Sequence, residues 1–205
     1  MRKIFLAFAA GIIALGINAQ TPDKGALMVR PMVGLSFSTM EYHMSMGGEI
    51  SRDSKMKTGF TGGVELGYQA NRWLQPSIGL FFQQQGSNFE FKELGVTHTS
   101  KENFNYLTIP VLANFYIIDG LALKTGIMPG FLLSAKETTS NSSFDVKDKS
   151  NSFQMQIPVG ISYEFSKFVI DARVAIPVTK ANKEDWEMDL SNTTIGITVG
   201  YNFNL

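Results

Sequence analysis

The sequence predicts an all-β protein: an eight-stranded antiparallel up-and-down transmembrane β-barrel. Three observations predict it. Several segments alternate between apolar and polar residues, their connections alternate between short and long, and no apolar run after residue 20 reaches the length of a membrane-spanning helix. Only 18% of the 205 residues are charged, below the roughly 25% of an ordinary soluble domain. Lys and Arg together number 18, as do Asp and Glu, so there is no charge excess to indicate nucleic acid as a partner.

The N-terminus has the features of a secretory signal peptide. Arg2 and Lys3 precede a short apolar run, and the small residue Ala19 stands at the expected cleavage site. The apolar run is too short to span about 30 Å of hydrocarbon. We therefore expect residues 1–19 to be removed on export and residues 20–205 to form the barrel domain. The chain has no cysteine, so we expect neither a lipid anchor nor a disulfide.

The alternation is clearest in the C-terminal third. From Phe153 to Phe165 the odd positions are apolar, whereas the even positions hold small or polar residues such as Gln154 and Ser162. A strand sends alternate side chains to opposite faces, so this pattern predicts strands with one apolar face. The same reasoning, applied upstream to weaker patterns, predicts eight strands near residues 27–37, 58–70, 73–86, 103–118, 120–135, 152–165, 168–179 and 190–205.

The connections between these strands alternate in length. Those at 71–73, 118–120 and 166–167 are tight, and Gly120 suits the left-handed position of a hairpin loop. The others are long and polar, at residues 38–57, 92–101, 136–151 and 179–189. Short periplasmic turns at one end and four longer extracellular loops at the other are typical of an outer-membrane barrel. Both ends of the barrel domain would then lie on the periplasmic side.

The alternative fold is a soluble periplasmic carrier of the lipocalin type, which also has eight strands. Such a carrier turns its apolar face inward and shows water a face rich in charge, whereas a membrane barrel does the reverse. Here the polar face is crowded with Gly, Ser and Gln and has few charges. Small residues suit a narrow, filled interior, so the membrane barrel is favoured.

Six charges fall on this inward face, three of each sign. They are Arg30, Lys124 and Arg173 with Glu65, Glu164 and Asp171. Counting from the short turns places all six in the periplasmic half, where they can pair across the lumen. Unpaired charges would be costly there, so we expect a structural network of ion pairs. Eight strands leave just enough room for side chains, and an open channel is not expected.

Aromatic residues mark both ends of the apolar face. Near the short turns lie Tyr68, Trp73, Phe165, Phe168, Tyr201 and Phe203, and near the long loops lie Phe37, Phe60, Phe82, Phe131 and Phe153. Two aromatic girdles are expected where a barrel meets the two membrane interfaces. We therefore expect outer-membrane lipid and lipopolysaccharide as partners, and other envelope proteins at the outer loops.

Proline recurs inside the strand-like segments, although it lacks the N–H that a ladder needs. Pro110, Pro129, Pro158 and Pro177 each lie about eight residues above a short turn. A shared height on four consecutive strands predicts a ring of bends at the outer rim, with disturbed ladder pairing around each proline.

Residues 106–116, YLTIPVLANFY, resemble the YLxIPxLxxxY strand of the PorT-like outer-membrane β-barrel proteins of Bacteroidota-type bacteria. Residues 126–131, GIMPGF, resemble the GxxxGxL-like strand that follows it in that family. The resemblance implies an eight-stranded barrel in the outer membrane of a Gram-negative cell, associated in the best-known member with a secretion apparatus. It carries over no catalytic or binding residue.

Residues of the predicted outer loops offer candidate chemistry. Met40, His43, Met44, Met46 and Met56 are soft ligands that copper could use, yet no second histidine or carboxylate completes a spaced site. A lipid A-modifying enzyme, which needs a histidine, a serine and an acid, could use His43, Ser45 and Glu49 or His98, Ser100 and Glu102. Asn141 begins a glycosylation triplet, and Trp186 is a loop aromatic that could touch a partner. We expect no metal, no cofactor and no enzymatic activity, and a structural or accessory role in the cell envelope.

Overall fold

The computed structural model describes residues 21–44, 54–93, 96–139, 142–179 and 188–205, almost all of them in β-strands. The strands are β1 (Leu27–Met44), β2 (Ser54–Tyr68), β3 (Leu74–Glu93), β4 (Val96–Thr108), β5 (Val111–Ile118), β6 (Leu121–Thr139), β7 (Ser142–Asp145), β8 (Phe153–Phe165), β9 (Phe168–Pro177), β10 (Met188–Tyr201) and β11 (Phe203–Asn204). A 3-10 turn, η2, spans Lys147–Lys149. In the described ranges no helix is long and apolar enough to cross a membrane.

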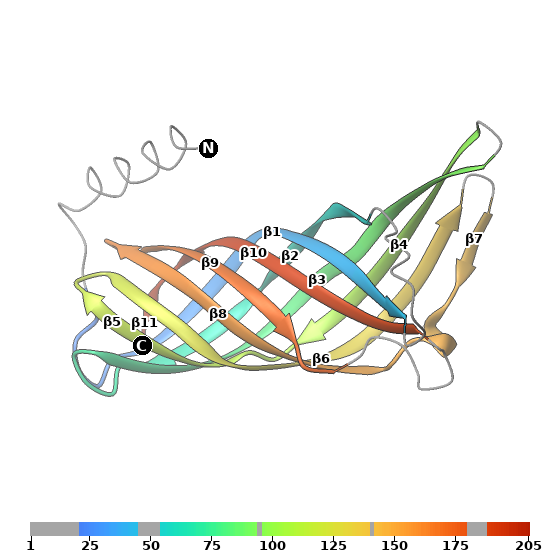
Figure 1. The fold of residues 1–205 in the computed structure, drawn as a ribbon. Helices are drawn as coiled ribbons and strands as arrows, with labels where there is room; N and C mark the ends of the chain where they lie inside the picture. Colours follow the sequence, from blue (N-terminus) through green and yellow to red (C-terminus); the bar gives the residue numbers. More distant parts are fainter. Residues whose placement is uncertain (1–20, 45–53, 94–95, 140–141, 180–187) are drawn as a thin grey trace.

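The sheet closes on itself as an antiparallel barrel (Figure 1). Its wall has eight members, because β4 and β5 are two halves of one strand interrupted at Ile109 and Pro110, and β7 and β11 are short additions. The last long strand, β10, pairs with the first, β1, from Met32 opposite Gly200 to Met44 opposite Met188. The predicted eight-stranded up-and-down barrel is confirmed.

The barrel is apolar outside and polar inside. Val33, Leu80 and Ile197 are about half exposed on the outer face, whereas Gln75 and Asn114 are almost fully buried in the lumen. Burial alternates along β5 and β8 as the period of a strand requires. A soluble carrier would have the opposite arrangement, with the apolar face around its ligand.

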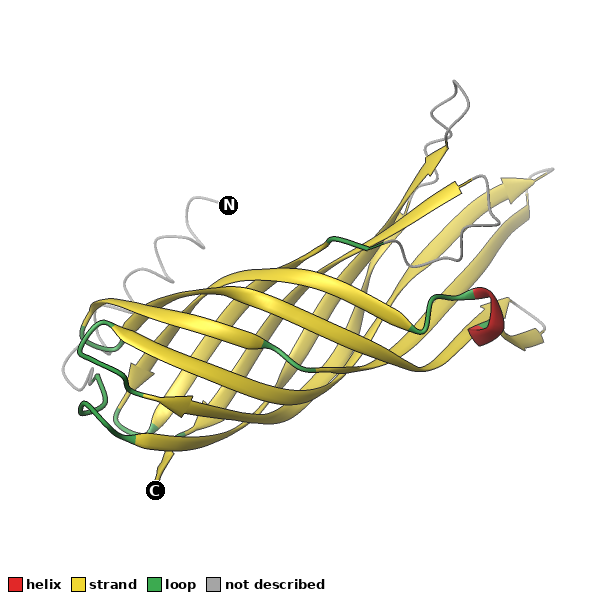
Figure 2. Cartoon of the chain, turned by 90° about the horizontal axis from the view of Figure 1, so that it is seen from below, coloured by secondary structure: helices red, strands yellow, loops and turns green. Residues whose placement is uncertain are grey.

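The three short turns lie together at one end of the barrel (Figure 2). Gly120 has a φ of 77°, so the predicted left-handed glycine is confirmed. In the first turn the Asn71 Oδ1 accepts hydrogen bonds from the backbone N–H groups of Trp73 and Leu74, at 3.0 Å each. The first and last strands also meet at this end, where the N–H of Leu205 donates to the carbonyl of Leu27 at 2.9 Å.

At the other end the strands are longer than the sequence predicts. The predicted loop 92–101 is wrong, because β3 continues to Glu93 and β4 begins at Val96. Parts of the predicted loops 38–57 and 136–151 also belong to strands, since β1 extends to Met44 and β7 pairs with β6. The charged residues of these segments suggested loops, yet Phe89 and Phe91 alternate with Glu90 and Lys92, and the backbone ladders continue.

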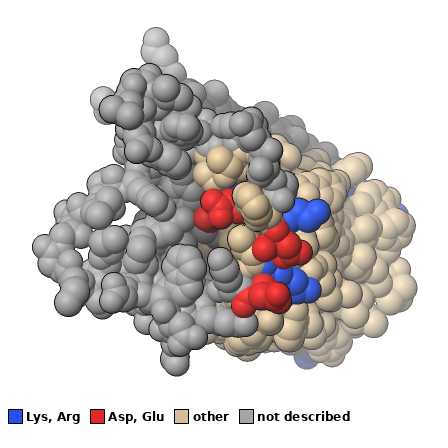
Figure 3. All heavy atoms as spheres, turned by 90° about the vertical axis from the view of Figure 1, so that its right-hand side faces the viewer, with Lys and Arg blue, Asp and Glu red and all other residues tan. Residues whose placement is uncertain are grey.

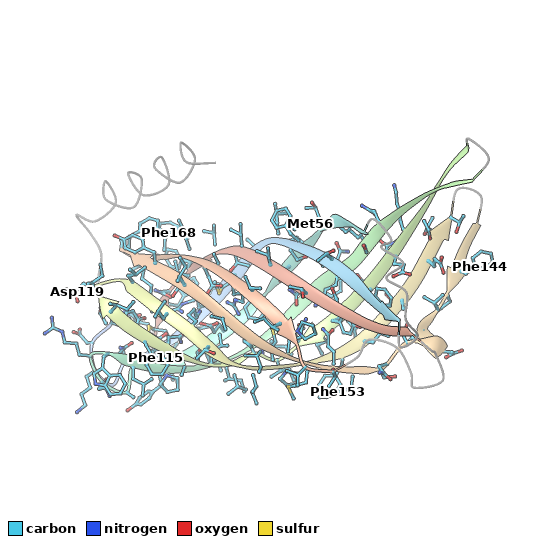
Figure 4. All side chains as sticks on the ribbon, viewed as in Figure 1. Met56, Phe115, Asp119, Phe144, Phe153 and Phe168 are labelled. Carbon is cyan, nitrogen blue, oxygen red and sulfur yellow. The ribbon has the colours of Figure 1, made fainter. Side chains whose placement is uncertain are left out.

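Aromatic side chains cluster on the outer face at both predicted levels. Near the short turns a row of ring contacts runs from Tyr163 through Phe165, Phe168 and Tyr201 to Phe203, with centroids 4.8 to 6.0 Å apart. Nearer the long-loop end, the rings of Phe131 and Phe153 are 5.6 Å apart. The rings of Phe115, Phe153 and Phe168 lie outside the ribbon of the barrel in Figure 4, as residues at a membrane interface should.

Candidate functional site

The six predicted charges all face the lumen, because each stands at an inward position of its strand. Register then places them side by side. Arg30 on β1 is opposite Glu65 on β2. On the far wall Asp171 on β9 is opposite Ser162 of β8 and Thr198 of β10, and Arg173 is opposite Gly160 and Gly196. Backbone pairing therefore brings together residues that are far apart in the sequence.

Arg30 forms one half of the charge cluster. Its Nη1 lies 3.0 Å from Glu65 Oε1 and its Nη2 lies 2.9 Å from Glu164 Oε1. All three side chains are nearly inaccessible to solvent. A guanidinium presents a planar set of donors, so one arginine can hold carboxylates on two sides of the lumen.

Lys124 and Arg173 form the other half. Asp171 accepts from both, at 2.7 Å from Lys124 Nζ and 2.6 Å from Arg173 Nε. Glu65 links the two halves, because its Oε1 lies 3.3 Å from Lys124 Nζ and its Oε2 lies 3.7 Å from Arg173 Nη2. The structure thus joins all six residues in one network with three charges of each sign.

Neutral side chains complete the network, and sequence reasoning did not identify them. Asn202 accepts from Arg30 Nε at 2.5 Å and donates to Glu164 Oε2 at 2.9 Å. The Tyr116 hydroxyl donates to Glu164 Oε1 at 2.5 Å, and Gln75 Nε2 donates to the Tyr116 hydroxyl at 2.9 Å. All three stand at inward positions near the short turns, which is the signal that could have found them.

Other side chains fill the rest of the lumen. Met32, Phe81 and Val169 form a small apolar layer beside the charges, since Val169 is opposite Glu164 in the β8–β9 ladder. The Arg173 guanidinium lies 5.6 Å from the centre of the Phe81 ring, at cation–π distance. Next comes an amide layer of Gln83, Gln85, Gln154, Gln156 and Asn192. Nearer the long-loop end, Phe104, Tyr106, Leu132 and Ala135 form a buried cluster. The inward aromatics were not predicted, because aromatic residues in a barrel suggest the outer girdles.

The proline prediction has a mixed outcome. Pro110 falls in the break between β4 and β5, and Pro177 ends β9. The β6–β8 ladder has no pairs between Thr125 and Met128, opposite Pro158. By contrast, Pro129 pairs with Met155 inside a regular stretch.

The expected height of the prolines is wrong for Pro110 and Pro129. Strand β4 continues from Thr108 back to Val96, and β6 continues to Thr139, so neither proline lies at the outer rim. Counting residues from the short turns misplaces the outer rim when the strand extensions above it are not recognised.

Several candidates from the sequence lie outside the described residues or have side chains that do. They are the signal peptide 1–19, Met40, His43, Met44, Ser45, Met46, Glu49, His98, Asn141 and Trp186. Ser100 and Glu102 are described: the Ser100 hydroxyl donates to Glu137 Oε1 at 3.0 Å. Within the described ranges no group of three or more His, Cys, Asp or Glu side chains is arranged to hold a metal ion.

Solved structures of outer-membrane barrels resemble this chain. Ail, the attachment invasion locus protein of Yersinia pestis, is 19% identical with a TM-score of 0.50, over 88% of this chain and 100% of Ail. The same protein in complex with the heparin analogue sucrose octasulfate gives a TM-score of 0.51 over the same shares. Neisserial surface protein A is 13% identical with a TM-score of 0.51, over 88% of this chain and 100% of its own. At these identities the likeness establishes the fold.

No curated protein sequence matches the chain. A family model does, over residues 18–182, and it is described as the outer membrane protein beta-barrel domain. This family is broader than the PorT-like group, which the match does not single out. The closed barrel, the apolar outer face and this match agree, and the chain belongs to the outer membrane protein β-barrel domain family, a protein of the outer membrane.

Proposed function

We propose that this outer-membrane protein is a structural or accessory component of the cell envelope whose lumen does not conduct. The observation that carries the proposal is the filled lumen. Six paired charges with an apolar layer beside them, an amide layer and an aromatic cluster occupy it. An eight-stranded barrel encloses little more than the volume of its own side chains, so layers of this kind leave no path for a hydrated ion.

The test of the closed lumen is electrical. The refolded barrel, shown to be folded by its heat-modifiable gel mobility, is added to a planar lipid bilayer beside an open porin as the positive control. We expect the porin to give unitary conductance steps and this barrel to give none. Reproducible steps from the folded barrel would overturn the proposal.

We further propose that partners are met at two surfaces. The apolar outer face contacts outer-membrane lipid, and the long-loop end meets lipopolysaccharide or other envelope proteins. Charges of both signs lie side by side at that end (Figure 3). The exposed charged residues at the long-loop end include Lys101, Lys136, Asp145 and Lys147. This mixture favours partners with groups of both signs over a purely polyanionic one such as the ligand of the Ail complex.

The absence of enzymatic activity is part of the proposal. A lipid A-modifying barrel needs room to hold an acyl chain, whereas the lumen cavity beside Arg173 and Thr198 has only about 20 Å³. Lipid A from a deletion strain and lipid A from the same strain after complementation should have identical mass spectra. If the two spectra differ, and a strain with His43→Ala or His98→Ala shows the same difference, the result would instead support enzymatic activity.

The secretion-apparatus role implied by the PorT-like resemblance of residues 106–116 is a narrower form of the same proposal. Chemical cross-linking in intact cells would test it. Capture of a secretion component by the wild-type barrel, and not by an unrelated eight-stranded barrel at the same expression level, would favour it. Equal capture by both barrels would count against it.

A further inference from the structure

One wall of the lumen carries a line of buried polar atoms that lack hydrogen-bond partners. Among the described residues, no hydrogen-bond partner is found for Gln156 Oε1, Asn192 Oδ1, Thr194 Oγ1, Thr198 Oγ1 and Arg173 Nη2, whose ion-pair contact with Glu65 Oε2 is 3.7 Å long. All five belong to the neighbouring strands β8, β9 and β10. Only two other described side-chain atoms are in this condition, the Tyr106 hydroxyl and Asn114 Oδ1. Concentration on one wall suggests a common cause.

Register places these atoms in order along the barrel. Thr198 is opposite Asp171 of the charge cluster, Gly196 is opposite Arg173, and Thr194 is opposite Ala175. Asn192 stands two residues further on, and its backbone carbonyl accepts from Gln156 Nε2 at 3.0 Å. Six residues of strand cover about 20 Å. The line therefore runs from the ion pairs to the amide layer.

Small residues open space beside this line. Gly196 has room around it, since an added Cβ would meet no atom closer than the Arg173 Cγ at 3.6 Å. A cavity of about 20 Å³ is lined here by Arg173, Thr194, Gly196 and Thr198, with Phe81 and Met128 on the other side. A cavity holds a water molecule when about 10–15 Å³ is available to it and two or more polar groups face it. The site meets both conditions.

We propose that the cavity on the β8–β9–β10 wall binds an ordered water molecule, which links Arg173 of the charge cluster to the threonine hydroxyls of β10. Water fits better than an ion, because the six nearby charges already balance and an added ion would be buried without a counter-charge. Water can donate to the threonine and amide oxygens and accept from the Arg173 guanidinium. The inference does not depend on the proposed function, since a buried water molecule is compatible with any role of the barrel.

The direct test is magnetisation transfer from water in solid-state NMR spectra of the barrel in lipid bilayers. We expect early transfer from water to the side chains of Thr194 and Thr198 and to the Arg173 guanidinium. Val199, which lies next to Thr198 on the lipid-facing side, is the internal control and should receive it late. Transfer to the two threonines as late as to Val199 would overturn the proposal.

A second test uses Thr198→Val, which replaces a hydroxyl by a methyl group of similar size. If water is bound, the variant removes one of its partners, and the urea midpoint of unfolding should fall. If no water is bound to the hydroxyl, the variant removes an unsatisfied polar group, and the urea midpoint of unfolding should stay the same or rise. That result would contradict the proposal. Thr125→Val is the matched control: Thr125 is exposed on the lipid-facing side of β6, so its midpoint should rise.

Discussion

Arg30 and Glu164 meet across the lumen, with Arg30 Nη2 2.9 Å from Glu164 Oε1, although 134 residues separate them in the sequence. Within the described ranges Arg30 is the only cation paired with Glu164. Removing one of the two charges leaves the other buried without its partner. Removing both leaves a balanced network with two charges of each sign.

We therefore expect Arg30→Met and Glu164→Gln each to lower the free energy of unfolding by about 3–5 kcal/mol. The double variant should lose clearly less than the sum of the two. Urea titrations in detergent micelles or bilayers, followed by tryptophan fluorescence, would measure this. Arg72→Met, in an exposed turn, is the control and should stay within about 0.5 kcal/mol of the wild type. Additive losses would show that the pair is not coupled.

The lipid-facing surface predicts a dependence on depth. Ile78 is 48% exposed on β3, between Trp73 at the short-turn end and Phe82 further up the same strand. Ile78→Arg should cost about 2–4 kcal/mol, because the charge would lie near the middle of the bilayer. Ile118, which is 62% exposed beside the turn between β5 and β6, is the matched position. Ile118→Arg should cost at most about 1 kcal/mol. If refolding titrations show the same loss of stability for both variants, Ile78 does not lie near the middle of the bilayer.

The turn between β8 and β9 contains a strained residue. Ser166 has a φ of 53°, in the left-handed region that costs a non-glycine residue roughly 1–2 kcal/mol. Ser166→Gly relieves this strain but gives the unfolded chain more freedom, so we expect a net gain of up to about 1 kcal/mol. Lys167→Gly, at the next position and without a positive φ, should be destabilising. Thermal melting in detergent would compare the two, and a loss of stability in Ser166→Gly would contradict the prediction.

The seam between β1 and β10 distinguishes two glycines. A Cβ at Gly34 would lie 2.0 Å from the Ile197 carbonyl oxygen, and backbone at a ladder cannot easily retreat. Gly196 on the partner strand has the space already described. Gly34→Ala should therefore leave a large fraction of the protein at unfolded mobility on an unheated gel, and Gly196→Ala should leave a much smaller fraction unfolded. Equal folded fractions would show that the seam can adjust.

The sequence predicted the part of the fold that contacts lipid. Where a strand has one face in hydrocarbon, as from Phe153 to Phe165, the contrast between apolar and polar residues must follow the two-residue period, and strand and orientation can both be read from it. The upper part of β3 and β4 contains more charged residues, and only a short alternation of Phe89 and Phe91 with Glu90 and Lys92 indicates a strand there. A pattern of that length does not distinguish a strand from a polar loop.

The candidate site follows the same rule. Charge on an inward position is rare enough to be noticed, and the six charged residues were selected in this way. Neutral inward residues such as Gln75, Tyr116 and Asn202 resemble any other lumen residue until the register is known. Tyr106 and Phe104 were missed for a further reason: the sequence does not say which aromatic rings fill the lumen and which line the membrane interface.

The pairing of β1 with β10 also limits when the barrel can form. Met32 must find Gly200, so the first strand keeps an unpaired edge until nearly the whole chain has been delivered. Contacts between residues so far apart in the sequence form slowly. Until they form, the unpaired edge of β1, with its apolar side chains, is prone to aggregation. A chain with this seam has to travel to its membrane unfolded and protected, and it becomes stable only in the step that closes the ring.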